Sequence, residues 1–273
     1  MRPLRRIWAL DYLSQMASTA GWIGFRRAAT TRWMLAVWLA FAAAHGGGAR
    51  AEETELPAPG RGGWRPLAFP KVSQLTVYTP VELDGREAVR AESRCSASAL
   101  LFRLEAVDLE RTPRLRWEWR VERDLVVADH RIKEGDDFAA RVYVLFEFRA
   151  EGASLWERLQ RRAAAVMFGS ELPGNAINYV WSSCEPAGAA WDNPFTPHSR
   201  MVSLGAGPLG LWRFEEVDVL ADYRAHFGAP VPPVVAVAVM SDSDNSCQAA
   251  EAYLARFRFV AGREGDTELR EMP

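Results

Sequence analysis

Residues 114–122 read RLRWEWRVE, a run in which hydrophobic and charged residues alternate at every position. Successive side chains of a β-strand point to opposite faces, so this run predicts a strand that buries one side of a sheet. Other strand-like runs lie at 75–83, 86–93, 139–148, 177–181, 211–217, 234–240 and 253–260. Many short strands with turn signals between them predict a mainly β fold, an antiparallel β-sandwich or jelly roll.

The connections between these runs carry turn and helix signals. Asp84 and Gly85 separate two runs, and this dipeptide suits a type I′ hairpin because both central residues need a positive φ. Two short helices are expected at the edges of the sandwich, at 154–168 and 218–227, since each begins at a capping residue and stops at a glycine. The run 234–240 (VVAVAVM) is apolar on both faces, so we expect it in the centre of a sheet.

The first 51 residues predict an export signal and are left out of the fold. Arg26, Arg27 and Arg32 form a cationic region, the apolar run 33–44 follows, and residues 49–51 (ARA) form a small-x-small cleavage site. About twelve apolar residues rise only ~18 Å as a helix, which is too short for a bilayer core of ~30 Å. We therefore expect cleavage after residue 51 and a periplasmic or secreted protein.

The rest of the chain is expected to divide into three parts. Residues 52–63 are polar and contain proline and glycine, so we predict a flexible leader. Residues 64–262 are expected to form a single β-sandwich domain, and residues 263–273 a polar tail. Met16 is a plausible alternative start, in which case residues 1–15 are an over-called segment.

The charge of the mature chain excludes some partners. The whole chain has 33 Lys and Arg and 35 Asp and Glu; seven arginines and one aspartate lie in 1–51, which leaves 26 and 34 and a net charge of −8. Nucleic acids and anionic membrane surfaces attract positively charged proteins, so we expect neither as a partner. No later stretch reaches 18 apolar residues, so no membrane span is expected after the signal is cleaved.

Three cysteines, Cys95, Cys184 and Cys247, allow one disulfide in an oxidising compartment. All three pairings are open from sequence. We favour Cys184 with Cys247, because both follow strand-like runs at polar loops, and three unpaired cysteines are the alternative.

The loop 241–246 (SDSDNS) is the candidate cation site. Asp242, Asp244 and Ser246 have the first, third and fifth spacing of a calcium loop. Cys247 stands at position six instead of glycine and Tyr253 at position twelve instead of glutamate, so the loop is not an EF-hand. We expect no cofactor; a looser calcium site in 242–246 is the alternative to a self-capping turn.

Asp136 and Asp137 precede a strand-like run that contains Arg141. Paired carboxylates can serve as acid and base in glycoside hydrolysis, but adjacent strand residues point to opposite faces and so do not converge on one bond. Asp137 and Arg141 can share a face, so an ion pair between them is the alternative to a functional role.

Aromatic and polar residues gather between 175 and 195. Trp181 and Trp191 lie close in sequence to Asn178 and Asp192, and sugars are held by rings beside amide and carboxylate groups. The alternative is that both tryptophans belong to the core.

Five ordered blocks of the chain resemble a known family. These blocks are GDDFAARVYVLFEF (135–148), LPGNAINYVWSS (172–183), WDNPF (191–195), LADYRAHFGAPVPPVVAVAVMSDSDNS (220–246) and AYLARFRF (252–259). They are similar to the bacterial domain of unknown function numbered 3047, a set of mostly exported proteins, over roughly residues 64–260. The family's last motif has threonines where this chain has serines, but Asp242, Asp244 and Asn245 are kept. The resemblance implies export and fold and transfers no activity; the closing order of elements is also similar to galactose-binding-like jelly rolls.

These observations lead to one functional hypothesis with two alternatives. We expect non-catalytic binding of a glycan or another polar envelope ligand. The expected site consists of Asp136, Asp137, Arg141, Asn178, Trp181, Trp191, Asp192, Asp242, Asp244 and Asn245. The alternatives are a glycan hydrolase that uses paired carboxylates and a structural or partner-binding envelope protein.

Overall fold

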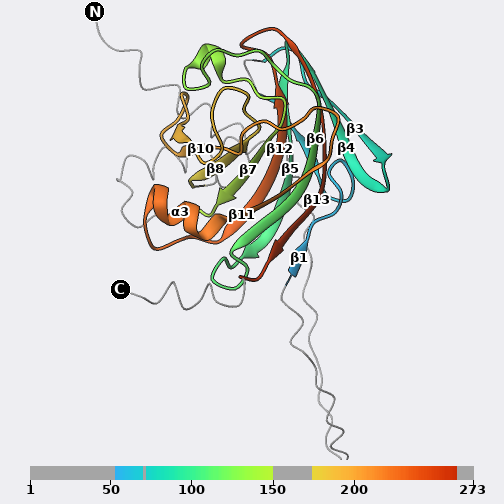
Figure 1. The fold of residues 1–273 in the computed structure, drawn as a ribbon. Coiled ribbons are helices and arrows are strands. Elements are labelled where there is room, and N and C mark those ends of the chain that lie inside the picture. The colour runs from blue at the N-terminus through green and yellow to red at the C-terminus, as the bar shows by residue number, and fades with distance from the viewer. Residues whose placement is uncertain (1–52, 70–71, 150–173, 263–273) are drawn as a thin grey trace, which may run out of the picture.

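Two β-sheets lie face to face in the computed structural model, which describes residues 53–69, 72–149 and 174–262 (Figure 1). The first, sheet A, has the strand order β11 (Arg213–Asp218), β6 (Arg114–Arg123), β13 (Ala249–Val260), β4 (Arg86–Arg94) and β3 (Val77–Leu83). Strand β1 (Glu53–Glu55) also pairs with β13. All pairs in sheet A are antiparallel.

The second sheet, sheet B, contains seven strands. Their order is β2 (Arg65–Leu67), β5 (Ala97–Val107), β12 (Val234–Asp242), β7 (Arg141–Phe146), β8 (Ala176–Val180), β10 (Ser199–Ser203) and β9 (Ala190–Asp192). Strands β8 and β10 are parallel and the other pairs are antiparallel. The apolar run at 234–240 forms most of β12, between β5 and β7, so its predicted central position is confirmed.

The alternating run at 114–122 forms β6, and its apolar side faces the core between the sheets. Leu115, Trp117, Trp119 and Val121 are fully buried, while the charged residues between them face outward. The Trp117 ring stacks on Phe257 of β13, with ring centroids 6.3 Å apart. A mainly β sandwich is therefore confirmed.

The predicted hairpin and one predicted helix are present. Asp84 and Gly85 join β3 to β4, and both have the positive φ that the turn requires (52° and 69°). Helix α3 (Val219–Phe227) begins at Asp218, whose carboxylate accepts a hydrogen bond from the Ala221 amide at 2.9 Å. The helix expected at 154–168 lies outside the described residues.

The expected flexible leader at 52–63 is instead tied to sheet A. Strand β1 pairs with the end of β13, and the Leu56 amide donates to the Phe257 carbonyl at 2.9 Å. Leu56 is buried, and the Trp64 indole donates to the Pro57 carbonyl at 2.8 Å. Strand pairing uses the backbone, so the polar side chains that suggested a leader do not prevent it.

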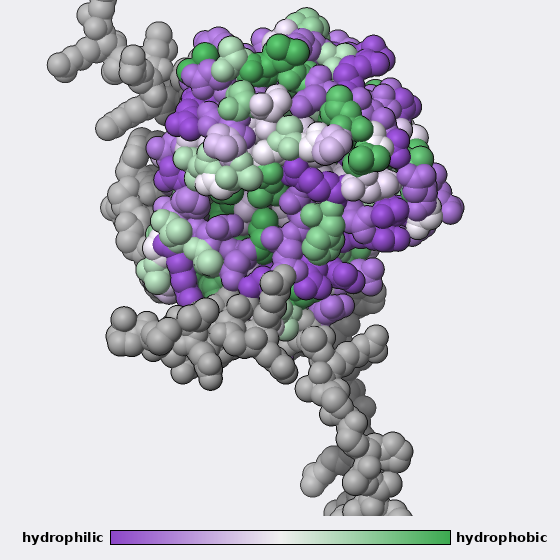
Figure 2. Space-filling view, viewed as in Figure 1, coloured by the Kyte–Doolittle hydropathy of each residue, from purple (hydrophilic) through white to green (hydrophobic). Residues whose placement is uncertain are grey.

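The described residues include no helix that is long and apolar enough to cross a membrane. On the face shown in Figure 2, hydrophobic residues are dispersed among hydrophilic ones.

The favoured disulfide, Cys184 with Cys247, is wrong. Cys95 forms the disulfide with Cys247, and Cys184 is an exposed free cysteine. The pairing of β4 with β13 explains this, because the Cys95 amide donates to the Gln248 carbonyl at 3.0 Å and so holds the two loops together. The bridge joins positions 152 residues apart, a separation that sequence reasoning did not connect.

We expect Cys95→Ser to lower the free energy of unfolding by about 2–4 kcal/mol, because the bridge closes a long loop of the unfolded chain. Urea unfolding measures this change, with Cys184→Ser as the matched control. A thiol titration of the denatured, unreduced protein should find one thiol in each chain. Equal stability of the two variants, or three titratable thiols, would contradict this assignment.

Candidate functional site

Four connections meet at one end of the sandwich, and contacts among them define the candidate site. The loop 243–248 is bound on three sides: by the disulfide to Cys95, by Asn245 to the 136–137 segment, and by Gln248 to Val126. The Gln248 amide both donates to the Val126 carbonyl (2.9 Å) and accepts from its amide (3.0 Å). The fourth connection, after β8, joins through Ser183, whose hydroxyl donates to the Leu125 carbonyl at 3.4 Å.

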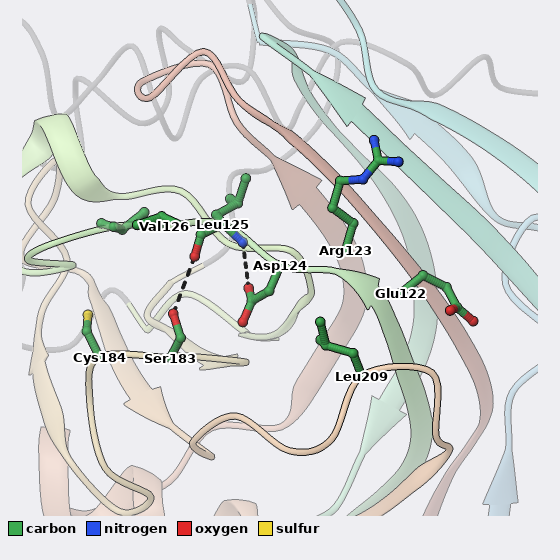
Figure 3. Close-up of a pocket in the computed structure, with 9 residues that line it drawn as sticks. Glu122, Arg123, Asp124, Leu125, Val126, Ser183, Cys184 and Leu209 are labelled. Atoms are coloured by element: carbon green, nitrogen blue, oxygen red, sulfur yellow. Dashed lines mark hydrogen bonds between the residues drawn. The ribbon is translucent and has the colours of Figure 1, made fainter.

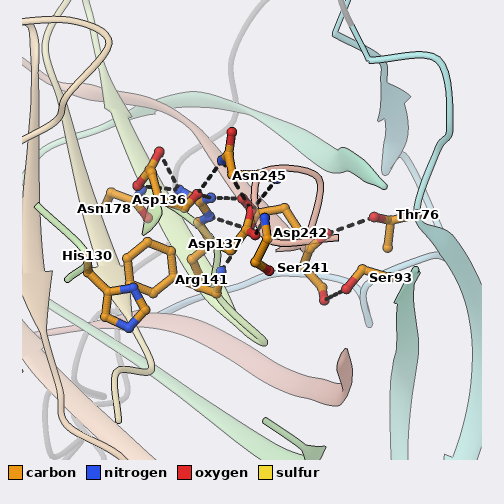
Figure 4. Close-up of polar contacts among 12 residues, drawn as sticks. Thr76, Ser93, His130, Asp136, Asp137, Arg141, Asn178, Ser241, Asp242 and Asn245 are labelled. Carbon is orange, nitrogen blue, oxygen red and sulfur yellow. Dashed lines mark hydrogen bonds and ion pairs between the residues drawn. The ribbon is translucent and has the colours of Figure 1, made fainter. Parts of the chain in front are cut away.

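Arg141 is the centre of this site (Figure 4). It is the first residue of β7, and only 2% of it is exposed. Its Nε donates to Asp242 Oδ1 at 2.7 Å, and its Nη2 bonds the other oxygen of the same carboxylate. Nη2 also donates to the Asp136 carbonyl at 2.8 Å, while Nη1 lies 3.4 Å from the Asp136 carboxylate. The guanidinium therefore contacts two buried acids from two different segments.

The sequence left an ion pair with Arg141 as one alternative for Asp137; in the structure the Asp137 carboxylate bonds to the 243–248 loop. Its Oδ1 accepts from the Asn245 amide at 3.1 Å, and its Oδ2 accepts from the Ser246 amide at 2.5 Å. The carboxylates of Asp136 and Asp137 have different partners, Arg141 for the first and the 243–248 loop for the second. Asp137 thus holds the 243–248 loop, and Arg141 uses Asp242 as its main partner.

Hydrogen bonds already occupy two of the three carboxylates in the described residues that could bind a calcium ion. Asp137, Asp242 and Asp244 each offer a carboxylate oxygen, and these oxygens lie within 4.8 Å of one another. Calcium needs six to eight oxygen ligands. Asp242, however, is already bonded through both oxygens to the Arg141 guanidinium, and both Asp137 oxygens accept backbone amides. Among the three, Asp244 is the exposed carboxylate.

Burial shifts the pKa of the acids in this cluster. Burial raises the pKa of Asp136 to about 6, against the opposing effect of the Arg141 charge and hydrogen bond. Burial and the nearby Asp137 charge raise the pKa of Asp244 as well. The protonation of the Asp136 carboxyl therefore changes in the mildly acidic range.

The two tryptophans belong to the core, so their expected role as exposed sugar-stacking rings is wrong. Trp181 is 1% exposed, and its indole donates to Asp124 at 3.0 Å. Trp191 is 6% exposed and lies in a cluster with Phe138 and Met201. Neither ring presents a face to a ligand.

The remaining predicted residues divide between buried and exposed positions. Asn178 on β8 is fully buried, and its amide group donates to the Met201 sulfur at 3.2 Å. Asp192 is exposed at the edge strand β9 and pairs with Arg200 at 2.6 Å. The structure therefore brings together Asp136, Asp137, Arg141, Asp242, Asp244 and Asn245.

A groove of about 550 Å³ is lined by Val126, which bonds to Gln248 of the 243–248 loop, and sequence reasoning missed this groove (Figure 3). Its lining includes Leu125, Val126 and Val127 of the β6–β7 connection together with Ser183, Cys184 and Leu209. Val126 and Leu209 are exposed apolar side chains. In sequence these residues are short apolar runs and turns that resemble ordinary loops, so no local signal marks the groove.

Comparison with known proteins identifies a family and a set of structural neighbours. Residues 62–258 match the family model described as a protein of unknown function, DUF3047. No curated protein matches the chain.

The solved structures that resemble the chain are β-rich proteins. A family 11 carbohydrate-binding module of a cellulosomal cellulase of Clostridium thermocellum is 7% identical, with a TM-score of 0.42 over 78% of this chain and 96% of that one. A family 30 module from the same organism is 8% identical, with a TM-score of 0.42 over 77% and 98%. A family 12 xyloglucanase from Bacillus licheniformis is 8% identical, with a TM-score of 0.38 over 77% and 100%. We take no functional argument from likenesses at these scores.

Arg141→Met is expected to lower the free energy of unfolding by about 3–5 kcal/mol, because it leaves buried carboxylates without a positive partner. The double variant Arg141→Met/Asp242→Leu should recover part of this loss, since one unpaired carboxylate is then removed. Arg256→Met, which removes an exposed guanidinium paired with Glu118, should cost less than about 1 kcal/mol. Urea unfolding of the three variants compares them; equal losses for Arg141 and Arg256 would contradict the central role of Arg141.

The raised pKa of Asp136 predicts a pH dependence of stability. Because the folded protein holds this proton more tightly than the unfolded chain, the contribution is fully present below pH 3.8 and is lost as the pH rises through about 6. Asp136→Asn keeps a neutral side chain at every pH. The stability of this variant relative to the wild type should therefore increase from pH 4 to pH 7 in urea unfolding. A constant or decreasing difference would show that folding does not raise the pKa of Asp136.

Proposed function

The chain belongs to the DUF3047 family, and we propose that it is an exported envelope protein that binds a glycan or another polar ligand without catalysis. The observation that carries this proposal is that the connections at one end of the sandwich are held together by a disulfide and hydrogen bonds, which we call the loop end. There a groove of about 550 Å³ is lined by Val126, which bonds to Gln248 of loop 243–248, and Asp244 and Asn245 are exposed on the same loop. Loops that are already held in place lose little conformational entropy when a ligand binds.

The state of the carboxylates favours binding over hydrolysis. Glycoside hydrolysis requires two carboxyl groups about 5–10 Å apart across an open cleft. Asp136, Asp137 and Asp242 are buried, and each bonds to Arg141 or to backbone amides. A sugar held at the loop end would therefore meet Asp244 but no second free carboxylate of this cluster.

Export to the periplasm or outside the cell is part of the same proposal. The signal-like segment 1–51 supports it, and so does the Cys95–Cys247 disulfide, since such bridges persist in oxidising compartments. We also assign the sandwich to the jelly-roll, galactose-binding-like type, with residues 64–262 as one domain. We propose that no metal ion is required, because Arg141 supplies the positive charge that the acidic cluster needs.

A structural or partner-binding role is the second candidate. The burial of Trp181 and Trp191 and the hydrogen-bonded aspartates favour it, because these residues then serve the stability of the loop end rather than a ligand. A ligand screen separates the two candidates.

We expect a glycan ligand to raise the melting temperature of the purified protein in a panel of envelope glycans. A ligand at a hundredfold excess over its Kd stabilises the folded state by about 2.7 kcal/mol. Asp244→Ala should reduce the rise in melting temperature. Glu105→Ala removes an exposed carboxylate on β5 and should leave the rise unchanged. Calcium and a chelator should both leave the melting temperature unchanged. If no glycan in the panel raises the melting temperature, the structural role is favoured. If the chelator lowers the melting temperature, the proposal that no ion is needed is wrong.

A further inference from the structure

Two aromatic side chains stand on the outer face of sheet A near the groove. Phe214 on β11 lies opposite Glu118 of β6, whose side chain faces away from the core, and 55% of Phe214 is exposed. Trp212 precedes Phe214 by two residues and is half-buried. Residues two apart along an extended chain point to the same side, so both rings face outward.

Trp212 is held in place by its neighbours. Its indole donates to Asp84 Oδ2 at 3.1 Å, and the Arg86 guanidinium lies 4.9 Å from its ring centroid. The Tyr253 ring of β13 lies 6.4 Å away. A ring that is already fixed loses little freedom when a ligand packs against it.

The charged groups around these rings are paired with one another. Arg120 bonds Asp84 at 2.9 Å and Glu122 at 2.5 Å, and Arg86 bonds Glu118 at 2.5 Å. On the next strands, Arg90 bonds Glu251 at 2.8 Å. Paired guanidinium and carboxylate groups produce no strong field of one sign, so they favour neither nucleic acid nor anionic lipid. They still offer planar donors and acceptors, which suit the hydroxyl groups of an uncharged sugar.

A chain of hydrogen bonds connects the groove to this face. Glu122 lines the groove and bonds to Arg120, Arg120 bonds to Asp84, and Asp84 accepts from Trp212. The segment of β6 from Glu122 to Glu118 is about 14 Å long at ~3.4 Å per residue. This length suits a chain of several sugar rings better than a single ring.

We propose that the groove continues over the outer face of sheet A as one elongated track for a linear, uncharged glycan, with Trp212 and Phe214 as its aromatic contacts. The inference rests on the proposed glycan-binding function and names its ligand class and its contact residues. The apolar faces of sugar rings pack on the two aromatic rings, and the paired charges bond the hydroxyls.

Calorimetry of the purified protein with a linear cello-oligosaccharide of six sugars tests this proposal. The two-sugar fragment serves as the short probe and heparin as the anionic probe. We expect tighter binding of the six-sugar chain and a loss of at least about tenfold in affinity for Trp212→Ala. Phe214→Ser should also weaken binding, and it alters an exposed side chain, so it decides the question if Trp212→Ala fails to fold. Val77→Ser removes an equally exposed apolar side chain (57%) on the opposite edge strand and should stay within about twofold of the wild type.

The outcomes separate this inference from the function on which it rests. If the wild type binds the six-sugar chain and Asp244→Ala abolishes binding while the Trp212 and Phe214 variants bind normally, the track is wrong and the loop-end site stands. If heparin binds and the six-sugar chain does not, the uncharged ligand class is wrong. If neither probe binds but the wider glycan panel gives a ligand, the linear track is wrong and the proposed function stands. If no glycan binds at all, both proposals fail.

Discussion

The buried guanidinium of Arg141 is the interaction on which the loop end of this protein depends. A buried carboxylate is strongly unfavourable unless it is paired, and here two acids from distant segments share one positive partner. Arg141 belongs to β7, Asp242 ends β12 and Asp136 lies in the connection before β7. Because Arg141 lies at the start of a central strand, its bonds to Asp136 and Asp242 hold the connection after β6 against the connection after β12.

Other contacts at this end of the sandwich restrain the neighbouring loop 243–248. Asp137 holds the backbone of the 243–248 loop, the disulfide ties that loop to the β4–β5 turn, and Gln248 ties it to Val126. The groove is thus bordered by connections that restrain one another. Loops held in this way lose little conformational entropy if a ligand binds to them.

The sequence could predict what is local and could not predict what depends on distant pairing. The alternation at 114–122 identified Trp117 and Trp119 as core residues, because the two-residue period of a strand is visible in any single run. Trp181 and Trp191 stand beside polar residues and were misassigned, since their burial depends on strands elsewhere in the chain. The partner of Arg141 is 101 residues away at Asp242, and nothing in either motif indicates the other. Strand β1 was missed because its pairing is made by backbone groups.

The position of strand β13 determines when sheet A can form as the chain is synthesised. It is the last strand of the described residues, yet it lies between β4 and β6 and also pairs with β1. Until residues 249–260 arrive, β4 and β6 each present an unpaired edge toward the gap between them, and most of sheet A consists of two separate pieces. A chain that is synthesised or threaded across a membrane from its N-terminus must therefore wait for nearly its whole length before this sheet can close, and its open edges need protection from other chains until then.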